Sequence, residues 1–231
     1  MINNALDIRP YQARLARYGR AQLRDFLQLP AAERLRDCLE REVRWEPAQR
    51  SDRPPLIPQE MATGEQADAL RLREAQARAR AGFEFLFDRY RMIDAHQEGR
   101  DPGLLLHVVV DFLNSAPFLE FARALTGEQG IRGVSAIAAR YRPGHFLRLH
   151  NDKASDEDRA FAYVINLGRG WQADWGGQLQ FVDDSGDVTE TMIPHWNSMS
   201  LFRVPQQHLV TPVARWAGDH RYSITGWFRR A

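Results

Sequence analysis

The chain has 231 residues, of which 44% are hydrophobic, and its 31 basic and 30 acidic residues leave a net charge of +1. This length and apolar content suffice for one buried core, and the balanced charge does not indicate a polyanion-binding surface. The single cysteine, Cys38, cannot form an intramolecular disulfide, and the sequence shows neither the apolar core of a signal peptide nor a run of membrane-spanning length. We therefore expect one soluble, cytoplasmic domain that binds neither membranes nor nucleic acids.

The first half of the chain is predicted to be largely helical. Pro30 is well placed in the first turn of a helix, and apolar residues recur at helical spacing as far as Val43. Residues 66–82, rich in Ala, Leu, Arg and Gln, predict a second helix that ends at Gly82. Between the two, the prolines and glycine of residues 45–66 favour an irregular loop, and loops of this length are often functional.

The next segment mixes strand and helix signals. Aromatic residues alternate over residues 83–87, which favours a strand whose aromatic side chains pack in a core. Residues 104–113 are apolar throughout and fit either a strand or a helix. Ser115 is expected to be the N-cap of a further helix that Gly127 ends.

After Gly133 the chain changes to short β-prone runs separated by Gly, Pro, Asn and Asp. The runs cover roughly residues 134–142, 146–151, 160–167, 178–183, 187–193, 198–204, 208–214 and 221–229. Eight short strands with such turn residues predict a jelly roll. We therefore expect a mainly β domain with N-terminal helices: residues 132–230 form a double-stranded β-helix, and residues 1–131 supply opening strands and helices packed on one sheet.

Three residues of the β-rich half could hold a metal ion together. His150 and Asp152 are two positions apart in FLRLHNDK, so both side chains point to one face of an extended strand. His208 follows 58 positions later (208 − 150), at the start of HLVTPV. Two imidazoles and one carboxylate form the facial triad of non-haem Fe(II) oxygenases, which leaves metal positions open for other ligands. Each residue alone is more often structural, but the ordered set in a strand context favours a metal site.

Arg221, which follows His208 by 13 positions (221 − 208), adds a candidate anion-binding group. On a strand it shares one face with Ser223, Thr225 and Trp227. A guanidinium fork binds carboxylates well, a hydroxyl of Ser223 or Thr225 could donate to the same carboxylate, and Trp227 would wall the pocket. The alternative is a structural surface ion pair formed by Arg221.

Several stretches of the second half resemble the 2-oxoglutarate- and Fe(II)-dependent dioxygenases, specifically the prolyl-hydroxylase branch. They are ARYRPGHFLRLHND, AYVINLGRGWQADWGGQLQF, IPHWNSMSLFRV, HLVTPV and RYSITGWF. The chain is especially similar to predicted bacterial proline hydroxylases and to the catalytic domain of ribosomal prolyl hydroxylases. The likeness covers roughly residues 132–230 and extends more faintly to RAQLRDFLQLPAAERLRDCLE, which looks like the family's opening strand and first helix. It implies that residues 1–231 form a single dioxygenase domain.

The resemblance also implies roles for the candidate residues. His150, Asp152 and His208 would bind Fe(II) and form the catalytic centre, with 2-oxoglutarate and O₂ as co-substrates and Arg221 holding the far carboxylate. Tyr141 stands where the family has a tyrosine that contacts the co-substrate, although a plain core tyrosine fits its sequence context equally well. The implied reaction hydroxylates an unactivated C–H bond and releases succinate and CO₂, with ascorbate as the reductant by family analogy.

The resemblance favours a prolyl residue of a protein or peptide as the substrate, for example in the translation apparatus. A hydroxylase of a free amino acid or another small molecule would use the same core and stays open. A nucleic-acid demethylase is less well supported, because Ser223 and Trp227 stand where that branch has Asn and a second Arg. A non-catalytic jelly-roll binding module would share the fold but would not need all four key residues.

Five further features are candidates for contacts around the site. His145 precedes the first predicted ligand and could reach a substrate, and Tyr163 is a second tyrosine that could contact the co-substrate. Trp171 and Trp175 lie in a loop that the resemblance places near the pocket mouth, where they would pack against a prolyl ring or anchor an exposed lid. We also expect part of residues 45–66 to cover the mouth.

Overall fold

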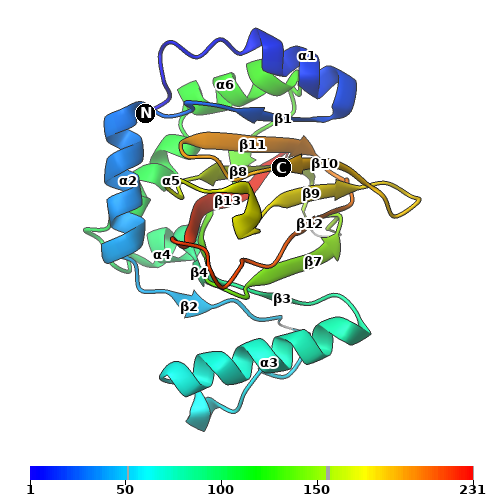
Figure 1. The fold of residues 1–231 in the computed structure, drawn as a ribbon. Helices are drawn as coiled ribbons and strands as arrows, with labels where there is room; N and C mark the ends of the chain where they lie inside the picture. The colour runs from blue at the N-terminus through cyan, green and yellow to red at the C-terminus, as the bar shows by residue number, and fades with distance from the viewer. Residues whose placement is uncertain (51, 155–156, 231) are drawn as a thin grey trace.

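The computed structural model describes residues 1–50, 52–154 and 157–230. Within these ranges the strands form two antiparallel sheets that face each other (Figure 1). The larger sheet contains β1 (Arg20–Leu23), β2 (Glu46–Pro47), β4 (Asp88–Tyr90), β5 (Gly133–Val134), β6 (Ile137–Tyr141), β8 (Arg159–Asn166), β11 (Ser198–Arg203) and β13 (Arg221–Arg229). The smaller sheet contains β3 (Phe85–Leu86), β7 (Phe146–His150), β9 (Leu179–Val182), β10 (Val188–Met192) and β12 (His208–Val210).

The order of the strands shows how the chain winds. The larger sheet runs β1-β11-β8-β13-β6-β4-β2, with β5 paired to β13 beside this path, and the smaller sheet runs β10-β9-β12-β7-β3. From β6 onward, consecutive strands alternate between the two sheets, except that β9 and β10 are neighbours in the smaller sheet. This winding confirms the predicted double-stranded β-helix, and it leaves an interior between the sheets.

Helices cover the outside of the larger sheet. They are α1 (Arg9–Tyr18), α2 (Leu29–Arg41), α4 (Met92–Glu98), α5 (Leu105–Leu113) and α6 (Ala116–Thr126). Their apolar residues share one buried cluster with β1, β8, β11 and β13. The remaining helix, α3 (Glu65–Ala81), packs instead against the smaller sheet, where Ala75 joins Leu86 and Phe146 (Figure 1). The expectation that the helices cover one sheet therefore holds except for α3.

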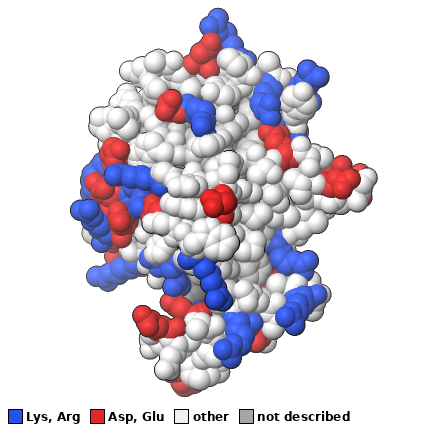
Figure 2. Space-filling model, in the orientation of Figure 1, with Lys and Arg blue, Asp and Glu red and all other residues white. Residues whose placement is uncertain are grey.

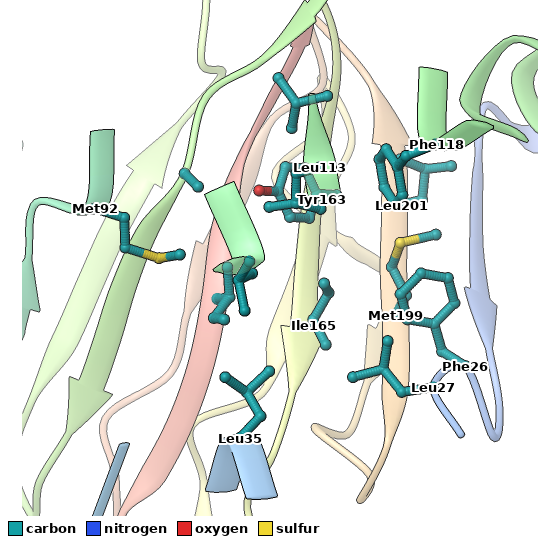
Figure 3. Packing of buried hydrophobic residues seen from close by; sticks show 14 of the residues in the cluster. Phe26, Leu27, Leu35, Met92, Leu113, Phe118, Tyr163, Ile165, Met199 and Leu201 are labelled. Atoms are coloured by element: carbon teal, nitrogen blue, oxygen red, sulfur yellow. The ribbon is translucent and has the colours of Figure 1, made fainter. Parts of the chain in front are cut away.

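The main core lies between the helices and the larger sheet, away from the interior of the jelly roll (Figure 3). Leu113 and Phe118 from the helices and Tyr163, Ile165 and Leu201 from the strands all have at most 2% of their surface exposed. Full burial of one such apolar side chain contributes about 1.5–3 kcal/mol to folding. This core makes the larger sheet a rigid support for the residues on its opposite face.

Local signals explain most of the helix boundaries. Pro30 lies in the first turn of α2, as predicted. The hydroxyl of Ser115 accepts a hydrogen bond from the backbone N–H of Phe118 at 3.4 Å, and Gly127 follows α6 with φ 72°, so both predicted ends of this helix are confirmed. The helix α1 was not predicted, because its sequence is largely polar and Leu15 is its single buried residue.

All eight predicted β-runs contain strands, with two changes. The first run is split into β5 and β6, and the last residues expected with β12 leave the sheet after Val210. The predicted strand over residues 83–87 is confirmed only for β3, which is limited to Phe85–Leu86, and the next strand, β4, belongs to the other sheet. The ambiguous apolar residues 104–113 form α5, since they supply the buried face that packs on the larger sheet.

Two 3₁₀ turns, η1 (Gln59–Met61) and η2 (Ala173–Trp175), interrupt the loops. The described part of the predicted loop 45–66 is irregular apart from β2 and η1. It packs against α3: Leu56 is buried in the cluster of Ala75, and Arg78 donates hydrogen bonds to the carbonyls of residues 54 and 55 at 2.8 and 3.0 Å.

No single helix in the described ranges is long and apolar enough to cross a membrane. The helices α5 and α6 reach that length and composition only as a pair bent by 56°, and both contribute buried residues to the main core.

Candidate metal centre and co-substrate pocket

His150, Asp152 and His208 come together at the ends of two neighbouring strands of the smaller sheet. His208 on β12 lies directly opposite His150 on β7, and Asp152 follows two residues after His150. His150 Nε2 lies 3.2 Å from Asp152 Oδ1, and His208 Nε2 lies 3.5 Å from Asp152 Oδ2. One ligand atom from each residue lies within 4.8 Å of the other two. In the part of the chain that the structure describes, this is the one such group of three that could hold a metal ion.

The backbone orients both imidazoles. Nδ1 of His150 lies 2.9 Å from the carbonyl oxygen of Arg148, and Nδ1 of His208 lies 2.8 Å from that of Gln206. A carbonyl oxygen can only accept, so each Nδ1 carries the proton and the lone pair of each neutral ring is on Nε2. Both free Nε2 atoms therefore face the carboxylate of Asp152, as in a pair of metal ligands oriented by their hydrogen-bond partners.

The charges of the group suit a divalent cation. Burial alone would raise the pKa of Asp152, but the adjacent His150 and His208 and the indole of Trp227 hold it below its usual value. Burial, together with the nearby His150, lowers the pKa of His208 to about 4. An ionised carboxylate beside a neutral imidazole at neutral pH is the donor set that Fe(II) requires, so the residues present fit that ion.

A cavity of about 120 Å³ lies between the two sheets next to this group. It is lined by the three candidate ligands together with other residues predicted for the site: Tyr141, Arg221, Ser223, Thr225 and Trp227. Its remaining walls are mainly apolar, and they include Phe87, Leu147 and Leu179. The structure thus brings the three candidate ligands and these five residues to one cavity.

Arg221 is a buried cation in this cavity. Its exposed fraction is 3%, and among the described residues its guanidinium makes no ion pair and its Nε has no hydrogen-bond partner. Its Cζ lies 5.0 Å from the centre of the Tyr141 ring. Burial lowers the pKa of Arg221, which shows the cost of keeping an unpaired charge from water. A surface ion pair is therefore not the role of Arg221 here, and an unpaired guanidinium in a cavity is suited to binding an anion.

The neighbours of Arg221 differ in what they can offer such an anion. The hydroxyl of Thr225 already donates to the carbonyl of Tyr163 at 2.7 Å, so its proton is engaged. Ser223 lines the cavity from the same strand and is the better donor. Tyr141 is buried against Phe87, with ring centres 5.0 Å apart, and burial raises its pKa to about 12, so the phenol stays protonated.

Other candidates are not brought to the cavity. Tyr163 is fully buried in the main core, and its hydroxyl donates to the carbonyl of Ser135 at 2.9 Å. His145 is buried beside a separate pocket with Asp68 and Arg142. None of the described residues of 45–66 lines the cavity either, and these residues pack against α3 instead.

Trp171 and Trp175 support the site from outside rather than lining it. Trp171 is 7% exposed, packs edge-on against Trp175 with ring centres 5.4 Å apart, and donates from Nε1 to the carbonyl of Gly176 at 2.9 Å. A Cβ atom at Gly177 would lie 3.1 Å from the Trp171 ring and 3.2 Å from Cδ of Arg221. A glycine is therefore needed where Trp171 packs behind the Arg221 side chain.

The apolar walls are the part of the site that the sequence did not reveal. Ile137, Ala139 and Tyr141 alternate along β6 toward the cavity, a period-2 pattern that could have indicated them. Val164 lines the cavity from β8. No local pattern distinguishes such wall residues from ordinary core residues.

The buried His145 makes acid lability a testable property of the metal-free protein. Burial lowers its pKa to about 4, while Asp88 acts in the opposite direction. Between pH 6.5 and 4 the unfolded chain therefore binds a proton that the folded protein does not, so stability falls as the pH falls. Denaturation curves should show that His145→Gln reduces this loss by up to about 3 kcal/mol. A variant that keeps the full pH dependence of the wild type would contradict this assignment.

Comparisons with known proteins agree with the geometry. Residues 136–229 match the family model described as the 2OG-Fe(II) oxygenase superfamily. No curated protein gives a significant match to the chain.

Solved structures share the whole fold at low identity. A prolyl-4-hydroxylase from Pseudomonas putida is 24% identical with a TM-score of 0.63, covering 97% of this chain and 99% of that one. An oxidoreductase of the 2OG-Fe(II) oxygenase family from Burkholderia pseudomallei is 17% identical with a TM-score of 0.65, covering 100% and 94%. A prolyl hydroxylase from Trichoplax adhaerens, solved with a peptide fragment of the hypoxia inducible factor oxygen degradation domain, is 16% identical with a TM-score of 0.65, covering 95% and 87%.

The matched region contains His150, Asp152, His208 and Arg221, which are the residues that the structure gathers around one cavity. Residues 136–229 therefore form a 2OG-Fe(II) oxygenase domain, which carries the candidate metal centre of this enzyme.

Proposed function

We propose that this oxygenase hydroxylates a prolyl residue of a protein or peptide, using Fe(II), 2-oxoglutarate and O₂ and releasing succinate and CO₂. The observation that carries the co-substrate assignment is Arg221, a buried guanidinium without an acidic partner among the described residues, in the same cavity as the metal-binding group. A dicarboxylate that binds a metal through one end and Arg221 through the other satisfies both halves of this cavity. The prolyl substrate is supported by the sequence resemblance and by the shared fold.

Different residues would bind the metal and the co-substrate. His150, Asp152 and His208 would hold Fe(II), which with 2-oxoglutarate and O₂ supplies the oxidising power for C–H hydroxylation. Arg221 would bind the far carboxylate of 2-oxoglutarate and Ser223 would donate a hydrogen bond to it, so that the co-substrate enters in one orientation.

The side chains that line the cavity also control the environment in which the co-substrate binds. The apolar side chains around it exclude water, which strengthens the interaction between Arg221 and a carboxylate. The protonated hydroxyl of Tyr141 can donate a hydrogen bond to the bound co-substrate.

The surface charge is consistent with a protein or peptide partner. Figure 2 shows Lys and Arg interspersed with Asp and Glu over the face in view. A nucleic-acid substrate would need a continuous basic surface, which this face does not have.

The test is succinate formation by the purified protein with Fe(II), 2-oxoglutarate and ascorbate, the reductant that we propose. Prolyl peptides, first those from proteins of the translation apparatus, would be compared with the same peptides carrying Ala in place of Pro. We expect a prolyl peptide to stimulate succinate formation and to gain one oxygen atom by mass spectrometry. Stimulation by free proline but not by any peptide would favour a small-molecule hydroxylase. A protein that neither forms succinate nor binds Fe(II) and 2-oxoglutarate would refute the enzymatic function.

A further inference from the structure

Arg159 connects the metal-binding group to the wall of the cavity. It is the first residue of β8, at the end of the segment that follows β7. Its Nη1 donates to the backbone carbonyl oxygen of Asp152 at 3.2 Å, and its Nε donates to Oε2 of Glu157 at 2.8 Å. Its Cζ lies 3.6 Å from the centre of the Trp227 ring. Three contacts thus hold the guanidinium in one place.

The backbone of Asp152 is held by hydrogen bonds on both sides. Asp152 has φ 60°, a left-handed conformation that Asp adopts more readily than most residues with a side chain. The turn around it is held on one side by Asn151, whose Oδ1 accepts from the N–H of Lys153 at 3.1 Å. Arg159 holds the other side by fixing the direction of the Asp152 carbonyl group.

Trp227 couples this backbone contact to the cavity. Its ring stacks on the guanidinium of Arg159 and also lines the cavity beside Asp152. Its buried indole N–H has no hydrogen-bond partner among the described residues. Arg159 therefore contacts both the backbone of Asp152 and the ring of Trp227, which lines the cavity.

We propose that Arg159 is a positioning residue for the metal site: its hydrogen bond to the Asp152 carbonyl keeps the Asp152 carboxylate directed at His150 and His208 before the metal binds. The proposal rests on the proposed function in so far as these three residues bind Fe(II). Groups that orient metal ligands typically change metal affinity by 10- to 100-fold when they are replaced. Arg159 would act in this way from outside the cavity, without touching the metal or a substrate.

The experiment compares three variants. Arg159→Met keeps an apolar stem over Trp227 but removes the donors and the charge, and Arg159→Lys keeps a donor and the charge. Arg229→Met is the matched control, because Arg229 lies directly opposite Arg159 in the ladder between β13 and β8 and makes no hydrogen bond with Asp152. Anaerobic calorimetric titration would give the Fe(II) affinity of each protein, and thermal unfolding without metal would give its stability.

We expect Arg159→Met to bind Fe(II) about tenfold or more weakly, Arg159→Lys to recover most of the loss, and Arg229→Met to match the wild type. The direction is informative, because loss of a positive charge near a cation site would by Coulomb's law alone strengthen binding. The affinity for 2-oxoglutarate at saturating Fe(II) should stay unchanged in all three variants.

Unchanged or tighter Fe(II) binding by Arg159→Met would overturn the proposal. So would an equal loss of affinity in Arg229→Met, or a loss that Arg159→Lys fails to recover while the metal-free protein unfolds at a lower temperature, since both indicate a general structural role. If the wild-type protein itself bound no Fe(II), the proposed function would fail together with this inference. That outcome is distinct from a loss confined to the Arg159 variants.

Discussion

Asp152→Ala is expected to weaken Fe(II) binding by on the order of 10³-fold and to abolish succinate formation. The variant leaves two imidazoles and no negative charge at the site. Opposite unit charges 4 Å apart attract each other by about 4 kcal/mol at an effective dielectric constant of 20, and every 1.4 kcal/mol is about a factor of ten in affinity. Anaerobic Fe(II) titration measures the affinity directly, without requiring a known substrate.

Asp158→Ala is the matched control for this prediction. Asp158 is exposed in the same connecting segment and pairs with Arg230 on the surface, with 2.6 Å between Nη1 of Arg230 and its Oδ1. Its loss should leave Fe(II) binding and succinate formation as in the wild type. Wild-type Fe(II) affinity in Asp152→Ala would show that the three residues do not form the metal site.

Arg221→Met is expected to weaken 2-oxoglutarate binding by about 100-fold or more, with little change in the affinity for Fe(II). Truncating one partner of a buried charge pair typically costs 2–5 kcal/mol, because the other charge is left unpaired in the interior. The KM for 2-oxoglutarate in the uncoupled formation of succinate, and the Kd from calorimetry in the presence of Fe(II), measure this loss.

The thermal stability of Arg221→Met shows whether Arg221 serves to bind the co-substrate or to stabilise the fold. Without ligands, Arg221 is a buried charge that no described acidic residue compensates, so its replacement by an apolar side chain should leave the unfolding temperature unchanged or raise it. If Arg221 stabilised the fold, its replacement by Met would lower the unfolding temperature instead. Arg229→Met, a change on the same strand, is the control and should retain wild-type affinity for 2-oxoglutarate. Wild-type affinity in Arg221→Met would place the co-substrate elsewhere.

The sequence predicted the second half of the chain better than the first. The strands from β6 to β13 follow from short β-prone runs bounded by turn residues, which are local properties. The helix α1 has one buried residue in a largely polar sequence, so its apolar positions did not stand out from those of an exposed segment. The separation of β3 from β4 could not be read from residues 83–87, because the two strands pair with partners in different sheets far along the chain.

The candidate site also contains residues that the sequence predicted and residues whose positions it did not predict. His150, Asp152, His208 and Arg221 were predicted because each chemical type and its order along the chain can be read directly. Trp171 was expected at the pocket mouth, but the turn after it brings its ring behind Arg221 instead. The direction of a side chain in a loop depends on its packing partners, which no local pattern specifies.

The amino-acid sequence by itself determined the donor set, its order and the β-type of the segments that carry it, because residue chemistry and period-2 alternation are properties of short stretches. Only the tertiary structure decided that Arg221 is buried without a carboxylate partner and that Arg159 reaches the carbonyl of Asp152. Both facts depend on which groups from different strands meet in the interior. Pairing and burial are set by the packing of the two sheets, and so they appear only when the chain is folded.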